Sequence, residues 1–84
     1  MQSVVIYTRE FCSYCSRALA LLQRKGVEFE QIDATMDQEK RAEMRERSGR
    51  STFPQIFIGG KPIGGSDELH ALEQSGELDR LLNG

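Results

Sequence analysis

The 84-residue sequence contains no tryptophan, only two cysteines and no long apolar segment. The apolar run at the N-terminus, Val4 to Ile6, is too short for the apolar region of a secretory signal. No segment approaches the roughly 20 apolar residues of a membrane-spanning helix. The sequence predicts no membrane partner, and the cytoplasm is the default expectation for its location.

Neither sign of charge dominates the chain. Its 11 basic and 13 acidic side chains are spread along the sequence and give a net charge of -2. Without a basic block or an acidic tail, the charge pattern predicts no nucleic-acid partner. The balance of 38% apolar and 29% charged residues is typical of a globular protein, and the length predicts one domain over residues 1–84.

The two cysteines, Cys12 and Cys15, lie three residues apart. Two cysteines are too few for a secreted disulfide scaffold. A bridge between them would close a very small loop, and loop-closure entropy, which is the main stabilising effect of a disulfide, grows with loop length. Their spacing therefore indicates reactivity rather than a structural bridge.

The first half of the chain alternates between strand and helix patterns. The nearly continuous apolar run of residues 3–8 predicts a buried strand, and residues 13–25 have helical apolar spacing, with Gly26 behind them. Residues 27–33 alternate as a strand does, which completes a βαβ unit with two parallel strands. Thr35 and Gln38 match a capping box, so we expect a charged helix from Thr35 to about Ser48.

The second half predicts a hairpin and two helices. Residues 55–58 and 61–63 read as strands joined by Gly59-Gly60. Ser66 is the expected N-cap of a helix that ends at Gly76, and a short final helix follows. The order β-α-β-α-β-β-α predicts an α/β fold: a four-stranded mixed sheet with helices on both faces.

Cys12 falls at the expected start of the first helix. Unpaired backbone N–H groups and the helix dipole stabilise an anion at that point. Because the thiolate is the attacking form of cysteine, the position predicts Cys12 as the nucleophile. Cys15, one turn inside the helix, is expected to be more buried and to act as the resolving thiol. Arg9 lies close enough in sequence to add positive charge.

Two other interpretations of the cysteine pair are weaker. A structural zinc site usually needs four ligands, and the chain has no second cysteine pair and a single histidine, His70. Two inert core cysteines are disfavoured by the polar neighbours of Cys12 and its place before a helix. The sequence therefore predicts no metal ligands.

Two further segments attract interest. Thr52-Phe53-Pro54-Gln55 places a proline before a strand, where either a cis peptide bond or an ordinary strand start is consistent with the sequence. Gly64-Gly65-Ser66-Asp67 precedes a helix. The segment fits either an anion-binding site or a simple turn with an N-cap.

Taken together, these segments resemble the dithiol glutaredoxins, most closely the short bacterial type. The resemblance covers nearly the whole chain and rests on four segments in order and spacing: Ile6-Tyr7-Thr8, Cys12-Ser13-Tyr14-Cys15, Thr52 to Ile58, and Gly64 to Asp67. It implies a thioredoxin fold with strand order 2-1-3-4. It also implies that Pro54 is cis and faces Cys12.

The same resemblance implies a glutathione-binding groove beside Cys12. In it, Tyr14 flanks the glutathionyl sulfur, and the backbone of Phe53, next to Thr52 and Pro54, pairs with the tripeptide as a strand does. Ser66 and Asp67, after Gly65, hold the γ-glutamyl end. Arg9 and Arg41 stand where the family often puts a group for the glycine carboxylate.

The chain departs from the family pattern at three positions. Ser13 replaces the usual Pro, which restores a backbone N–H and a hydroxyl near the thiolate. Phe53 replaces a smaller Val, which alters the groove, and Ser66 stands where some relatives carry a third Cys. Some glutaredoxins without that Pro hold a [2Fe-2S] cluster in a dimer, so a cluster carrier that uses Cys12 and glutathione as ligands is the alternative function.

The expected activity is the glutathione-dependent reduction of protein–glutathione mixed disulfides and protein disulfides by a monomer. Its partners are glutathione and glutathionylated or disulfide-containing proteins. A thioredoxin is disfavoured because the chain lacks both the Trp before the first cysteine and the Gly-Pro between the two cysteines.

Overall fold

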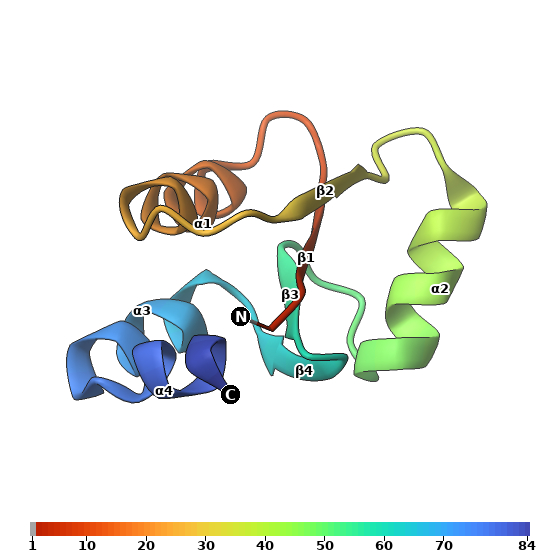
Figure 1. The fold of residues 1–84 in the computed structure, drawn as a ribbon. Coiled ribbons are helices and arrows are strands. Elements are labelled where there is room, and N and C mark those ends of the chain that lie inside the picture. The colour runs from red at the N-terminus through yellow and green to blue at the C-terminus, as the bar shows by residue number, and fades with distance from the viewer. Residues whose placement is uncertain (1) are drawn as a thin grey trace.

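Strands and helices alternate along the computed structural model, which describes residues 2–84. The order of the elements is β1 (Val4–Thr8), α1 (Ser13–Arg24), β2 (Glu30–Asp33), α2 (Gln38–Ser48), β3 (Gln55–Ile58), β4 (Lys61–Gly64), α3 (Ser66–Ser75) and α4 (Glu77–Asn83). Figure 1 shows them along the chain.

The four strands form one mixed sheet in the order β2-β1-β3-β4. β1 runs parallel to β2 and antiparallel to β3, and β3 and β4 form an antiparallel hairpin. The sheet confirms the predicted α/β architecture and the strand order 2-1-3-4 of the thioredoxin fold.

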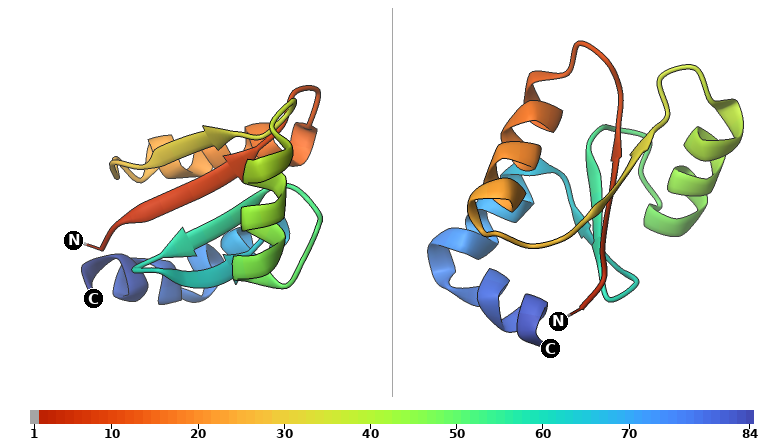
Figure 2. Two further views of the ribbon diagram at one scale, coloured as in Figure 1. Left: turned by 90° about the vertical axis from the view of Figure 1, so that its right-hand side faces the viewer. Right: turned by 45° about the horizontal axis from the view of Figure 1, so that its top comes forward.

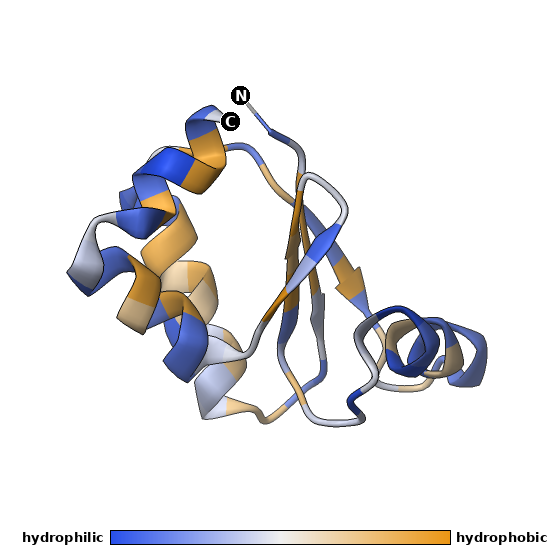
Figure 3. Ribbon diagram, turned by 90° about the horizontal axis from the view of Figure 1, so that it is seen from below, coloured by the Kyte–Doolittle hydropathy of each residue, from blue (hydrophilic) through white to orange (hydrophobic). Residues whose placement is uncertain are grey.

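Helices cover both faces of this sheet. Figures 2 and 3 show α1, α3 and α4 on one side of the strands and α2 alone on the other. The termini of the described chain meet at the end of the sheet farthest from α1's first turn, where the Gln2 N–H donates to the Leu82 carbonyl at 2.8 Å.

The side chains of β1 alternate between two apolar clusters, which explains why the strand is apolar on both faces. Val4 and Ile6 join the larger cluster with α1, α3 and α4, whereas Tyr7 packs against Met44 of α2 and Phe57 of β3. The Tyr7 and Phe57 rings meet edge to face, with their centroids 5.6 Å apart.

The strongly hydrophilic helix α2 (Figure 3) is held to the sheet by one buried side chain and a polar cluster. Met44 is its only buried residue. The buried Tyr7 hydroxyl donates to Glu43 and accepts a hydrogen bond of 2.9 Å from Arg47, whose guanidinium also lies over the Phe57 ring at 4.5 Å. These contacts fix α2 although it has almost no apolar face.

Two predicted boundaries before α2 were wrong. The strand expected over residues 27–33 pairs only from Glu30, because Val27 and Phe29 pack into the larger core cluster instead. α2 begins at Gln38 rather than near Thr35, because the Asp37 carboxylate caps it by accepting from the Lys40 N–H at 3.0 Å.

The predicted N-cap of α3 was also displaced by one residue. Gly65 occupies the N-cap, and the Glu68 carboxylate accepts its N–H at 2.6 Å. Ser66 is therefore the first helical residue, and its side chain is buried. The acidic residues of the first turn lie where the helix dipole favours negative charge.

Candidate active site

Cys12 ends the loop after β1 and is the N-cap of α1, as the sequence predicts. Its backbone is extended, with φ -125° and ψ 103°, and its Sγ accepts the Cys15 N–H at 3.2 Å. Its carbonyl accepts the Ser16 N–H at 3.1 Å, which begins the helical hydrogen bonds. The sulfur therefore lies at the positive end of the α1 dipole, where an anionic sulfur is stabilised.

Cys15 lies on the inner face of α1. Its exposure is 3%, against 9% for Cys12, which agrees with the prediction that it is the more buried of the two. Burial, and then its hydrogen bond with Cys12, raises the pKa of the Cys15 thiol to about 12. Because both thiols are free and Cys15 stays protonated at neutral pH, Cys12 is the thiol suited to first attack.

A hollow of about 180 Å³ lies beside the start of α1. It brings together most of the residues predicted to bind glutathione, although they come from three separate segments. Its lining consists of Tyr14, Arg50, Thr52, Phe53, Pro54, Gly65, Ser66, Asp67 and Glu68.

The loop before β3 is shaped by its proline and by one buried side chain. The Phe53–Pro54 peptide bond is cis, as the resemblance implies. The buried Gln55 side chain donates from Nε2 to the Thr52 carbonyl at 2.9 Å and to the Thr52 hydroxyl at 3.2 Å. The Thr52–Pro54 backbone is therefore held against the hollow.

The two arginines predicted for the glycine carboxylate do not line this hollow. Arg9 lines a second hollow of about 260 Å³, together with Phe11 and both cysteines. Arg41 donates to the carbonyls of Ala34 and Thr35 at 2.8 and 2.9 Å, and its guanidinium lies 5.3 Å from the centroid of the Phe53 ring. The structure thus places the Arg41 guanidinium over the Phe53 ring and engages its donors with the loop before α2.

Sequence reasoning missed Arg50 and Glu68, which also line the 180 Å³ hollow. The Arg50 guanidinium lies 3.5 Å from Glu68 Oε1, and about half of each side chain is exposed. Two signals were present in the sequence: Arg50 precedes the Thr52–Pro54 segment by two residues, and Glu68 lies three residues after the true N-cap, as a capping-box acid does.

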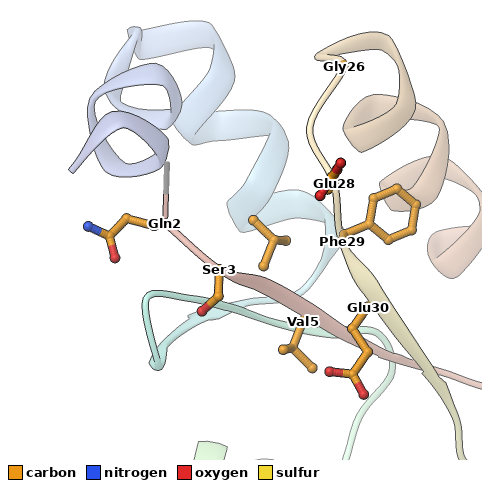
Figure 4. A pocket seen from close by; sticks show the side chains of 8 residues that line it. Gln2, Ser3, Val5, Gly26, Glu28, Phe29 and Glu30 are labelled. Carbon is orange, nitrogen blue, oxygen red and sulfur yellow. The ribbon is translucent and has the colours of Figure 1, made fainter.

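The largest hollow described, about 630 Å³, lies at the opposite end of β1 from Cys12. Figure 4 shows it between the start of β1 and the segment that leads into β2. Neither cysteine lines it, and Glu28, Phe29 and Glu30 are among its lining residues. This hollow is therefore separate from the two thiols.

Residues 2–84 contain neither a membrane-spanning helix nor a cluster of metal-binding side chains. None of the helices there is long and apolar enough to cross a membrane. Within the same residues, His, Cys, Asp and Glu side chains form no group of three or more that could hold a metal ion. The reactive groups that lie together at the start of α1 are the Cys12 and Cys15 thiols.

Comparison with known proteins gives one consistent result. The family model described as Glutaredoxin matches residues 4–63. Glutaredoxin 3 of Escherichia coli K12 is 54% identical over 82 residues, which are 98% of this chain and 99% of that protein.

Solved structures of other glutaredoxins have the same fold, as two examples show. The solution structure of a Brucella melitensis glutaredoxin shares 63% identity and a TM-score of 0.85, over 98% of this chain and 89% of that one. A crystal structure of a buckwheat glutaredoxin–glutathione complex shares 29% identity and a TM-score of 0.88, over 98% of this chain and 77% of that one.

Proposed function

The chain belongs to the glutaredoxin family of thiol oxidoreductases, and from this premise we propose that it uses glutathione to reduce protein–glutathione mixed disulfides and protein disulfides. One observation carries the proposal. Cys12 caps α1, its sulfur accepts a hydrogen bond from a backbone N–H, and the same first turn of α1 borders the 180 Å³ hollow through Tyr14. The proposal places the chain in the cytoplasm as a monomer, where glutathione keeps thiols reduced.

The chemistry of the 180 Å³ hollow suits glutathione, a tripeptide with two carboxylates and one ammonium group. The α3 N-terminus, at Ser66, offers N–H groups to a carboxylate, and the Asp67 carboxylate suits an ammonium. Arg50 adds a cation at the same rim, and the Phe53 backbone offers strand-like pairing. The buckwheat protein, a structural neighbour, is known in complex with glutathione, which supports this assignment.

The first reaction cycle needs only Cys12. Its thiolate attacks the glutathionyl sulfur of a protein–glutathione mixed disulfide, the protein thiolate leaves and takes a proton, and glutathione becomes bound to Cys12 by a new S–S bond. A second glutathione thiolate then attacks the glutathionyl sulfur, which releases glutathione disulfide and regenerates Cys12. Tyr14, half exposed at the start of α1, would flank the reacting sulfur.

The second cycle uses Cys15 as well. Cys12 attacks a protein disulfide and forms a mixed disulfide with one of its sulfurs, and Cys15 then loses its proton and attacks the Cys12 sulfur. The Cys12–Cys15 disulfide that results is reduced by two glutathione molecules. The high pKa of Cys15 keeps it protonated until that second step, when the leaving substrate thiolate can take its proton.

The test is the turnover of a small glutathione mixed disulfide by glutathione, in the wild type, Cys12→Ser and Cys15→Ser. We expect Cys12→Ser to be inactive and Cys15→Ser to retain activity, with loss only on protein disulfides. An active Cys12→Ser would contradict the proposal. An inactive wild type that carries a visible chromophore lost in Cys12→Ser would replace it with the [2Fe-2S] carrier function.

A further inference from the structure

Phe11, the residue before Cys12, is an exposed aromatic side chain in an unusual backbone conformation. Its side chain is 98% exposed. Its φ of 55° lies in the left-handed region, and Phe11 is the only non-glycine residue there among residues 2–84. Such a conformation is unfavourable for a bulky residue and is concentrated at functional sites in proteins.

Packing within the fold does not account for Phe11. The ring joins neither of the two apolar clusters. The Arg9 guanidinium donates to the Glu10 carbonyl at 3.1 Å, so the loop backbone is held while the ring remains in solvent. An exposed aromatic ring next to the nucleophile is in a position to contact whatever Cys12 attacks.

Phe11 lines a different hollow from the one assigned to glutathione. Phe11 lines the 260 Å³ hollow with both cysteines, whereas Tyr14 lines the hollow assigned to glutathione. Met36, 93% exposed, lies in the neighbouring loop. That loop is joined to the Phe11 loop by a hydrogen bond of 2.8 Å from the Glu10 N–H to the Thr35 hydroxyl.

We propose that Phe11 binds the polypeptide of disulfide substrates and selects those with an apolar residue next to the attacked cysteine. The proposal rests on the proposed function and deepens it. The reaction itself brings the occupant to this surface: in the Cys12–substrate disulfide the two cysteine Cα atoms lie about 4.4 to 6.8 Å apart. A residue next to the substrate cysteine is then within reach of the Phe11 ring.

The negative charge near this surface further restricts which substrate sequences fit it. Four carboxylates line the hollow beside Met36, those of Glu10, Asp33, Asp37 and Glu39. Hydrogen bonds from Thr35 lower the pKa of Asp33, which keeps that carboxylate ionised. A substrate segment that carries an apolar residue beside its cysteine and a Lys or Arg beyond it complements this surface.

A one-step reaction isolates the contact. In a Cys15→Ser background, Cys12 thiolate attacks the peptide sulfur of a peptide–thionitrobenzoate mixed disulfide. The peptide–thionitrobenzoate bond breaks, the coloured thionitrobenzoate anion leaves with the electron pair, and the Cys12–peptide disulfide forms. Absorbance then reports the rate of attack for acetyl-Leu-Cys-Gly-amide and acetyl-Ser-Cys-Gly-amide as the peptides.

We expect the Leu peptide to react faster, and Phe11→Ala to reduce its second-order rate roughly fivefold to tenfold, because about half of a large apolar contact is lost. The Ser peptide should change by less than about twofold. Phe11→Leu keeps an apolar side chain and should retain most of the preference. Phe11→Asn, which tolerates the left-handed backbone, should behave as Phe11→Ala does.

The outcomes separate the two proposals. If Phe11→Ala slows both peptides equally, or slows neither, the selective contact is wrong while the proposed function stands. If the parent protein reacts with neither peptide faster than free cysteine does, the proposed function itself is wrong. Loss in Phe11→Ala with full retention in Phe11→Asn would assign the effect to the backbone and overturn the contact.

Discussion

Gly64, at the end of β4, controls the shape of the proposed glutathione hollow through Glu68. Its φ is 116°, and a Cβ at this position would lie 2.8 Å from Glu68 Oε1 and 2.9 Å from Glu68 Cγ. Glu68 would have to move, which breaks its hydrogen bond of 2.6 Å with the Gly65 N–H. Gly64→Ala therefore changes both the α3 cap and two residues of the hollow.

Gly76, between α3 and α4, provides a matched control. Its φ of 83° is also unfavourable for alanine, but nothing lies within 4 Å of a Cβ there. The left-handed backbone costs roughly 1–2 kcal/mol in each variant. Gly64→Ala adds the lost cap, about 0.5–2 kcal/mol, and a steric clash. We expect it to be destabilised about twice as much as Gly76→Ala.

Thermal unfolding and glutathione kinetics test this difference. For a domain of this size, each 1 kcal/mol lowers Tm by roughly 4–8 °C. We expect the Tm of Gly76→Ala to fall by about this amount or somewhat more and its KM for glutathione to stay the same. In Gly64→Ala, the fall in Tm should be about twice as large and the KM for glutathione should rise severalfold. Equal losses of Tm, or an unchanged KM in Gly64→Ala, would refute the reasoning.

Three further outcomes follow from the polar contacts. Tyr7→Phe removes the buried hydroxyl that holds α2 and should lower the free energy of unfolding in urea by about 1–2 kcal/mol; an unchanged midpoint would contradict the role of that hydroxyl. Because burial raises the pKa of Cys15, its alkylation by iodoacetamide in folded Cys12→Ser should remain slow at pH 9, where an ordinary thiol reacts readily. Hydrogen bonds from Lys25 to the Asp79 and Glu73 carboxylates raise the pKa of Lys25, so protonated Lys25 stabilises the folded state. This stabilisation is complete below pH 10.5, the ordinary pKa of lysine, and is lost as the pH rises through the higher pKa of the folded protein. Lys25→Met should therefore lower the free energy of unfolding in urea at pH 7 and lower it progressively less above pH 10.5.

The sequence predicted most of the fold, because its periodicities and turn residues agree with one another. The predicted boundaries were wrong where the same residues fit two local structures equally well. Alternation over residues 27–33 does not distinguish a paired strand from an extended segment whose side chains enter the core, as Val27 and Phe29 do. Thr35 and Asp37 are both good caps, and Thr35 is instead used to join two loops.

The candidate site was predictable to the extent that it follows local motifs. Cys12 could be assigned to the helix N-cap from its position in the sequence between a strand pattern and a helix pattern, and the structure shows it there. The direction of a long side chain depends on tertiary contacts that no motif encodes. Arg41 therefore donates to loop carbonyls, while Arg50, which no motif singled out, lines the hollow beside Glu68.

The most direct test of the central claim is a backbone NMR comparison of Cys15→Ser before and after it forms its mixed disulfide with glutathione. We predict a single glutathione on Cys12, with the largest amide shifts at Tyr14, Phe53 and Asp67, around the 180 Å³ hollow. Shifts confined to the loop of Arg9 and Phe11, or no mixed disulfide at Cys12, would contradict it.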